Sequence, residues 1–220
     1  METGLATAFQ SSVTMFGDDE LPLPDQWSRP EDFATLFKYL WHRDFPMSEG
    51  AIGARRADWT IHIGIIVRNI GDLMGLATRF ERGKRKDALL RSFDGDEIAV
   101  EWEWQGIWGQ NELKKLREHE VWSPSKGIDR LLRYGVLITY THTPNIPRVY
   151  ERVSSEWTGA RWPLLLVLID LEETKKFRMG KDFKNIHFSV FNSAGQHKCL
   201  GSAPAFPWNV ESTRWSVQSI

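Results

Sequence analysis

Apolar residues recur along much of this chain at the spacing of an α-helix, with polar residues between them. The pattern predicts a helix over 29–42, and Ser28 and Glu31 are placed to cap its start. It predicts a second helix over 110–121. A third helix is predicted to begin at Pro147, because proline is favoured in the first turn. The apolar face of this third helix consists of Val149, Tyr150, Val153 and Trp157.

Other stretches carry strand patterns, either alternating or continuously apolar. Residues 87–104 place two apolar runs around an Asp-Gly dipeptide, which is typical of a tight turn, so they predict a β-hairpin. Strands are also predicted over 135–141, 164–171 and 185–191. A helix separates the first two of these, and this strand–helix–strand order predicts a βαβ unit with parallel strands.

Residues 58–81 carry two patterns at once. The first half alternates apolar and polar residues as a strand would, and the second half repeats apolar residues at helical spacing. We favour a long helix that begins at Asp58, in which Gly71 and Gly75 allow close packing against a neighbouring element.

Together these elements predict a single α/β domain over 28–220, with a mixed central sheet flanked by helices. Residues 1–27 lack periodicity and include Leu21-Pro22-Leu23-Pro24, so we expect them to form an arm that leads into the domain. The sequence contains no internal repeat and no low-complexity tract.

Composition adds limits to this picture. The chain has 220 residues, of which 41% are apolar and 26% are charged, and this excludes a disordered protein or a fibre. The formal net charge is -1, so the overall charge does not argue for a nucleic-acid or membrane partner. Cys199 is the only cysteine, which excludes an intrachain disulfide and a cysteine-based zinc site.

Nothing in the sequence predicts a membrane protein. The longest aliphatic run covers only 164–169, far short of the ~20 residues that span a bilayer. The first basic residue is Arg29, and acids precede it, so we do not expect a signal peptide. We therefore expect a cytoplasmic protein with no membrane partner. The 11 tryptophans indicate a core or a groove rich in aromatic surface.

Asp87, Glu101 and Glu103 are the strongest candidates for chemistry. Glu101 and Glu103 stand two apart on one predicted strand, so their side chains leave the same face with Cα atoms about 6.6 Å apart. Asp87 begins the partner strand of the hairpin. A turn near 94–96 would pair residue 101 roughly with residue 89, and a register shift or a bulge would then bring Asp87 close to the two glutamates.

Three carboxylates on one patch of sheet repel one another unless protons or a cation neutralise them. Oxygen ligands of this kind suit Mg²⁺ or Mn²⁺ rather than zinc, so Mg²⁺ or Mn²⁺ is the expected cofactor. The six histidines show no spacing typical of zinc hydrolases. The plainer alternative is that the alternating acids form a solvated strand face.

The order of these features resembles that of the PD-(D/E)XK nucleases, the restriction-endonuclease-like superfamily. In that family an acid on one strand is followed by a hairpin turn, then by Glu-x-Lys on the next strand, and then by a helix. The resemblance spans about 58–141 of this chain. The matching features are Asp87, Asp94-Gly95, Glu101-Trp102-Glu103, the helix over 110–121 and the strand over 135–141.

The resemblance implies a restriction-endonuclease-like fold and Mg²⁺-dependent hydrolysis of DNA phosphodiester bonds. It implies that Asp87 and Glu101 hold the metal, and that Glu103 holds the metal or helps to activate water. The chain departs from the family pattern at two positions. Lys86 precedes Asp87 where the family has proline, and Glu103 replaces lysine, as in some restriction enzymes of the superfamily.

The missing cation could come from the helix that follows the motif, where Lys114 and Lys115 are candidates. Most lysines on helices are simply exposed, and this remains the alternative for both. Of the two, we select Lys114 as the candidate catalytic residue.

A basic segment surrounds Asp87. Residues 79–91 carry a local charge of +4 within a chain of net charge -1, which would suit a phosphate backbone. We expect DNA as the partner, and a homodimer would match a twofold substrate. The alternative is a solvated loop. The residues expected to contact phosphates are Arg82, Lys84, Arg85 and Lys86.

Two other functions stay open. A binding module that keeps the nuclease-like fold without activity would explain the lost lysine. A glycan hydrolase would use the tryptophans, but the first acid of its strand motif would fall on Ala99. A second acidic group, Asp170, Glu172 and Glu173, ends a predicted parallel strand, where sites of α/β proteins tend to lie.

Overall fold

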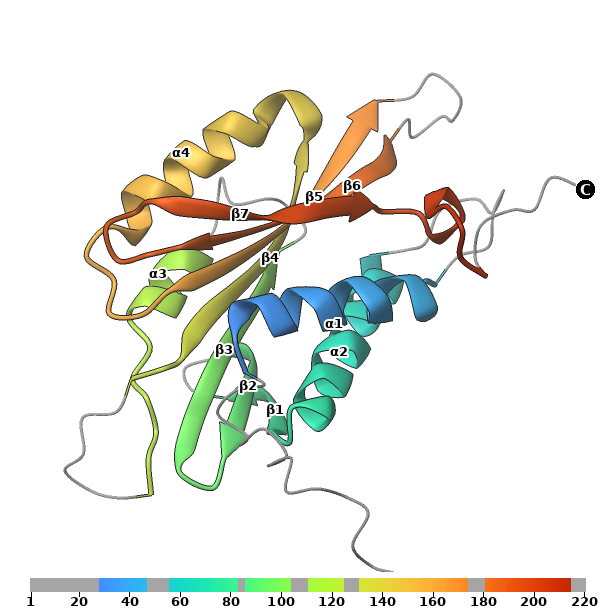
Figure 1. The fold of residues 1–220 in the computed structure, drawn as a ribbon. Coiled ribbons are helices and arrows are strands. Elements are labelled where there is room, and N and C mark those ends of the chain that lie inside the picture. The colour runs from blue at the N-terminus through green and yellow to red at the C-terminus, as the bar shows by residue number, and fades with distance from the viewer. Residues whose placement is uncertain are drawn as a thin grey trace, which may run out of the picture.

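The structure is a computed structural model that describes residues 28–46, 56–82, 86–103, 111–124, 131–173 and 181–214. Its strands form one mixed sheet in sequence order, β1 to β7 (Figure 1). Strands β3, β4 and β5 run parallel to one another, and the other neighbouring pairs are antiparallel. The strands are β1 (Ala77–Arg82), β2 (Lys86–Ser92), β3 (Gly95–Glu103), β4 (Tyr134–His142), β5 (Leu164–Glu173), β6 (Lys181–Phe191) and β7 (His197–Pro204).

Helices cover both faces of the sheet, as Figure 1 shows. One face carries α1 and α2, and the other carries α3 and α4. The predicted α/β class with a mixed sheet flanked by helices is therefore confirmed. The helices are α1 (Pro30–Arg43), α2 (Arg56–Leu73), α3 (Glu112–Arg117) and α4 (Ile146–Trp157).

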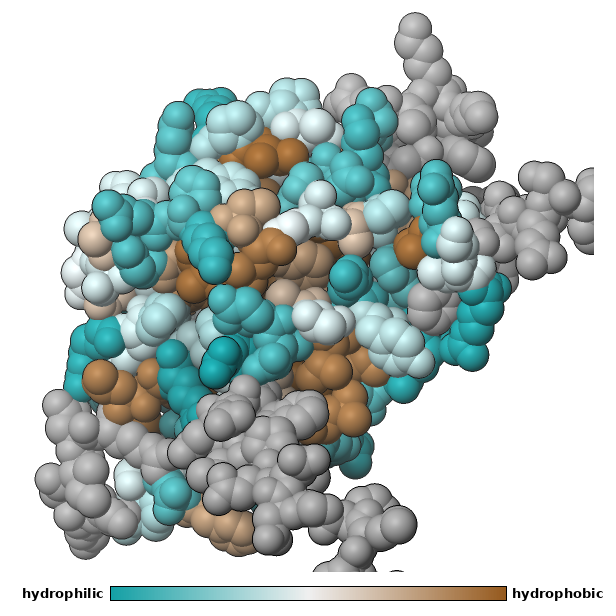
Figure 2. Space-filling view, viewed as in Figure 1, coloured by the Kyte–Doolittle hydropathy of each residue, from teal (hydrophilic) through white to brown (hydrophobic). Residues whose placement is uncertain are grey.

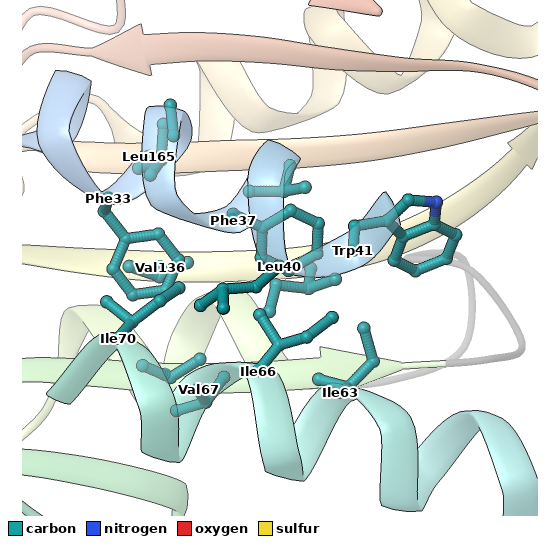
Figure 3. Packing of buried hydrophobic residues seen from close by; sticks show 14 of the residues in the cluster. Phe33, Phe37, Leu40, Trp41, Ile63, Ile66, Val67, Ile70, Val136 and Leu165 are labelled. Carbon is teal, nitrogen blue, oxygen red and sulfur yellow. The ribbon is translucent and has the colours of Figure 1, made fainter. Parts of the chain in front are cut away.

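Alternation along the strands divides the core into two clusters. On β3, Ile98 and Val100 pack under α1 and α2, whereas Ala99 packs on the side of α3 and α4. Burying one such large side chain stabilises the fold by roughly 1.5–3 kcal/mol. Figure 3 shows side chains of α1 and α2 pointing toward one another over β4. These side chains are Phe33, Phe37, Trp41, Ile63, Ile66 and Ile70.

The prediction of one long helix over 58–81 is wrong in its last part. Helix α2 ends at Leu73, because Gly75 adopts a φ of 69° and the amide of Leu76 donates to the carbonyl of Gly71. This arrangement is a Schellman motif, which stops a helix and turns the chain. The chain then continues as the edge strand β1.

The turn of the hairpin lies one residue earlier than the sequence predicts. Ser92 pairs with Gly95, so Phe93 and Asp94 form the turn, and the register shifts between Leu90 and Arg91. Beyond this irregularity Ala88 pairs with Val100. The expected pairing of residue 101 with residue 89 is therefore wrong, and Asp87 lies one step beyond the last pair, next to Glu101.

The surface shown in Figure 2 mixes hydrophilic and hydrophobic residues, and its hydrophobic patches are separated by hydrophilic side chains. Among the described residues, no helix is both long enough and apolar enough to cross a membrane. The predicted arm over 1–27 lies outside the described residues, as do Lys84 and Arg85.

Candidate active site

The hairpin register brings Asp87 and Glu101 together. Alternation puts both on the same face of the sheet as Leu89 and Ala99, which pack on the side of α3. Where the ladder ends, a carboxylate oxygen of Asp87 accepts a hydrogen bond of 2.7 Å from the amide of Trp102. Asp87 is therefore held by the strand that carries Glu101.

Glu101 is enclosed completely, with an exposed fraction of 0%. Neither of its carboxylate oxygens accepts a hydrogen bond from a nitrogen or hydroxyl group of the described residues. The carboxyl group of Asp87 is close enough to share a proton with that of Glu101. Two ammonium groups lie slightly farther away, that of Lys86 at 3.9 Å from Oε1 and that of Lys115 at 3.8 Å from Oε2. The carboxyl group thus sits between two cations without a direct hydrogen bond to either.

This environment makes the charged form of Glu101 unfavourable. Burial, helped by the neighbouring Asp87, raises the pKa of Glu101 to about 8, although Lys115 and Lys86 oppose the shift. Burial also raises the pKa of Asp87, against the amide of Trp102 and the charge of Lys115. Unless another cation is bound, ionisation of one of the two acids therefore disfavours ionisation of the other.

Helix α3 supplies the groups that face this pair. The ammonium of Lys115 donates a hydrogen bond of 2.9 Å to Glu112, which lies one helical turn earlier. Burial lowers the pKa of Lys115, but the hydrogen bond to Glu112 and the charge of Glu101 raise it overall. Lys115 is therefore held in the charged form beside the acids.

The remaining predicted catalytic residues lie farther from this pair. Glu103 is buried on the same face, and its carbonyl accepts a hydrogen bond from Thr139. Among the residues that the structure describes, no three His, Cys, Asp or Glu side chains gather closely enough to hold a metal ion. Lys114 is exposed on α3, so Lys115, and not Lys114, contacts the acids.

The residues expected to contact phosphates divide in a similar way. Arg82 ends β1, and Lys84 and Arg85 lie outside the described residues. Lys86, by contrast, is only 2% exposed, and its ammonium lies in the acidic cluster. Lys86 is thus not placed on the surface where the sequence predicts a phosphate contact.

The alternative acidic group at the end of β5 is already engaged. Asp170 accepts hydrogen bonds from the hydroxyl of Thr143 and the amide of Asn185, and His187 lies 3.5 Å from it. Glu172 is exposed and forms an ion pair of 3.6 Å with Lys184. The register of β5 and β6 shifts between Ile169 and Leu171, and there Asp170 accepts the hydrogen bond of the Asn185 amide. Asp170 therefore has a structural role.

Sequence reasoning missed the burial of Lys86 and the place of Glu112, and it named Lys115 beside Lys114 without preferring it. The helical spacing of Glu112 and Lys115 was a readable signal of an ion pair. Nothing in the sequence marked Lys86 as buried, because it belongs to a run of basic residues that is typical of a solvated loop. Its position depends on the hairpin register.

No protein-family model and no curated protein matches this chain. What the site can do is therefore judged from its own residues. It combines two adjacent buried carboxyl groups with two nearby lysines, and the carboxylate oxygens are the part of this set that suits a cation.

Proposed function

We propose that this protein is a metal-dependent nuclease that hydrolyses DNA phosphodiester bonds at the Asp87–Glu101 pair. The order α2, β1, β2, β3, α3, β4 supports this proposal, since it places an acid, a hairpin, a Glu-x-Glu strand and a helix in the sequence that the nuclease resemblance implies. The parallel pairing of β3 with β4 fits the same restriction-endonuclease-like arrangement.

The observation that carries the proposal is the state of Glu101. A buried carboxylate is costly unless a cation or hydrogen bonds compensate it. Both oxygens of Glu101 lack hydrogen bonds from nitrogen or hydroxyl groups of described residues, and Asp87 lies beside them. A purely structural glutamate would normally be satisfied by its surroundings, so these oxygens suit a ligand that the protein binds.

A divalent cation fits this donor set. Carboxylate oxygens are the preferred ligands of Mg²⁺ and Mn²⁺, and Asp87 and Glu101 would hold the ion. Glu103, which the sequence predicts as a third ligand, does not gather with them in the described part of the chain. When bound, such an ion polarises the phosphodiester and eases the ionisation of the attacking water.

The chain's own groups perform the remaining tasks. The amide of Trp102 orients Asp87, and Glu112 holds the ammonium of Lys115 beside Glu101. Lys115, in place of Lys114, would provide the positive charge near the reacting phosphate. Arg82, Lys84 and Arg85 are proposed to contact the DNA backbone.

Cleavage of plasmid and linear duplex DNA in Mg²⁺ and in Mn²⁺ tests the proposal. Asp87→Asn should abolish cleavage, because it removes a charged ligand while keeping the size of the side chain. Glu172→Gln, a neutralisation at an exposed acid, should leave cleavage unchanged and serves as the control. Cleavage that survives Asp87→Asn would place the active site elsewhere.

A second candidate is a module that keeps this fold without activity. Lys86 and Lys115 favour it, because they already place two positive charges beside Glu101. In that case the wild-type protein should show neither cleavage nor a change in melting temperature with Mg²⁺ or Mn²⁺. A response to metal would exclude this candidate.

A further inference from the structure

We propose that Lys86 is a positioning residue, an internal counter-ion that holds the carboxylate of Glu101 in place and competes there with the divalent cation. This inference rests on the proposed function of the site. It assigns to Lys86 a regulatory effect on metal occupancy instead of the phosphate contact that the sequence suggests.

The burial of Lys86 supports this role. Lysine is almost never fully buried unless its charge is paired, and Lys86 is only 2% exposed. Its ammonium lies 3.9 Å from Glu101, and the exposed fraction of the Glu101 side chain is 0%. Once Glu101 is ionised, these two buried opposite charges attract one another at a distance where little solvent screens them.

Lys115 provides an internal comparison. It approaches the other oxygen of Glu101 at 3.8 Å, but its side chain is 37% exposed and its ammonium donates a hydrogen bond to Glu112. Lys115 is thus bound to an acid of its own helix and can also reach solvent. Lys86 lacks that access to solvent, so solvent screens its charge on Glu101 less.

Competition with a metal follows from the same geometry. A divalent cation on the oxygens of Glu101 would lie close to the ammonium of Lys86, and like charges in a buried site repel. Lys86 would therefore stabilise the metal-free protein and weaken metal binding. A phosphate contact would instead need an exposed ammonium.

A double-mutant cycle in metal-free protein tests the first half of the proposal. Lys86→Met, Glu101→Gln and the double variant are compared by urea unfolding at pH 9, where Glu101 is ionised and Lys86 is still charged. Lys86→Met alone should lower the unfolding midpoint, and its effect should largely disappear in the Glu101→Gln background. Equal effects in both backgrounds would overturn the pairing. This outcome does not depend on whether the protein is a nuclease.

Metal and DNA titrations test the second half. Lys86→Met should tighten Mn²⁺ binding by roughly tenfold, and should leave the salt dependence of DNA binding unchanged. Lys115→Met is the matched control, and its effect on Mn²⁺ affinity should be smaller because solvent screens its charge. Unchanged Mn²⁺ affinity in Lys86→Met, or a flatter salt dependence, would overturn the proposal. If wild-type protein binds no Mn²⁺, the proposed function fails, while the cycle still decides the pairing.

Discussion

The carboxyl group of Glu101 is buried beside a second acid, so its charge depends on what else enters the site. Its two oxygens have no hydrogen bond from a nitrogen or hydroxyl group of described residues, and two lysines lie just beyond hydrogen-bonding distance. A side chain in this state should respond to pH, to metal and to neutralisation, and each response can be measured.

Neutralising Glu101 should remove a pH dependence of stability. The pKa of Glu101 is raised to about 8, so the folded protein holds a proton that the unfolded chain releases at lower pH. The resulting stabilisation is present below the ordinary pKa of glutamate and is lost as the pH rises through 8. Glu101→Gln should therefore flatten the decline of the metal-free melting temperature between pH 5 and pH 9, as measured by thermal scans. An unchanged decline would contradict this account.

His62 should make the protein sensitive to acid. It is 3% exposed among aromatic rings of Trp41, Phe45 and Trp59, and burial lowers its pKa to about 4. The unfolded chain thus binds the proton first, and stability falls as the pH drops from about 6.5 toward 4. The loss should reach about 3 kcal/mol.

Urea unfolding at pH 7 and pH 4.5 measures this effect. His62→Leu should reduce the difference between the two pH values, whereas His197→Gln, at an exposed histidine, should not. Equal pH dependence in wild type and His62→Leu would show that other groups cause the acid sensitivity.

At the scale of elements, the register of the β2–β3 hairpin decides which acids meet. The irregularity between Leu90 and Arg91 brings Asp87 next to Glu101. Asp96 fixes the turn end of this hairpin, since its carboxylate contacts Arg91, His119 and the amide of Trp122. The site therefore depends on contacts at the far end of the same two strands.

Two glycines allow a matched test of how closely the turn of this hairpin packs against its neighbours. Gly95 has a φ of 134°, and a Cβ there would lie 2.3 Å from the carbonyl oxygen of Trp122, whereas Gly75 has a φ of 69° with open space around it. Gly75→Ala should destabilise by about 1 kcal/mol through backbone strain alone. Gly95→Ala should destabilise by at least about 2 kcal/mol, because backbone atoms must also move. Equal losses in urea unfolding would contradict the tight approach at Gly95.

The sequence predicted the elements better than their ends and their pairing. The structure confirms four of the predicted elements, because their apolar residues are spaced so that one or both faces are buried. These are the helices over 29–42 and from Pro147 and the strands over 135–141 and 164–171. Strand β1 was missed because its exposed residues carry no strand alternation. The register was mispredicted because the Asp-Gly dipeptide does not lie at the two turn positions, which Phe93 and Asp94 occupy.

The site shows the same limit. Asp87 and Glu101 could be named from their spacing, and the hairpin indeed brings them together. The burial of Lys86 could not be foreseen, because a lysine in a basic run is usually exposed. Lys115 was a candidate, but nothing in the sequence preferred it to Lys114. The packing of α3 against β3 positions Lys115, and Lys86 has its position because it begins β2.

At the scale of the whole molecule, the proposed DNA contact rests on the basic segment around β1 and β2. If Arg82, Lys84 and Arg85 contact phosphates, changing them to alanine should weaken binding equally for different DNA sequences. It should also flatten the logarithmic salt dependence by about one unit for each lost contact. Lys198→Ala, at an exposed position on β7, is the control. An unchanged slope, measured by fluorescence anisotropy, would assign the segment to a solvated loop.

Direct measurement of Mn²⁺ binding tests the central claim, that the Asp87–Glu101 pair holds a divalent cation. Calorimetric titration of wild-type protein at pH 8 should show saturable binding of Mn²⁺ in the micromolar to millimolar range, with release of protons because Glu101 must ionise. Asp87→Asn and Glu101→Gln should each abolish the binding, and Glu172→Gln should retain it. Absence of binding in the wild type, or binding that persists in both site variants, would contradict the account.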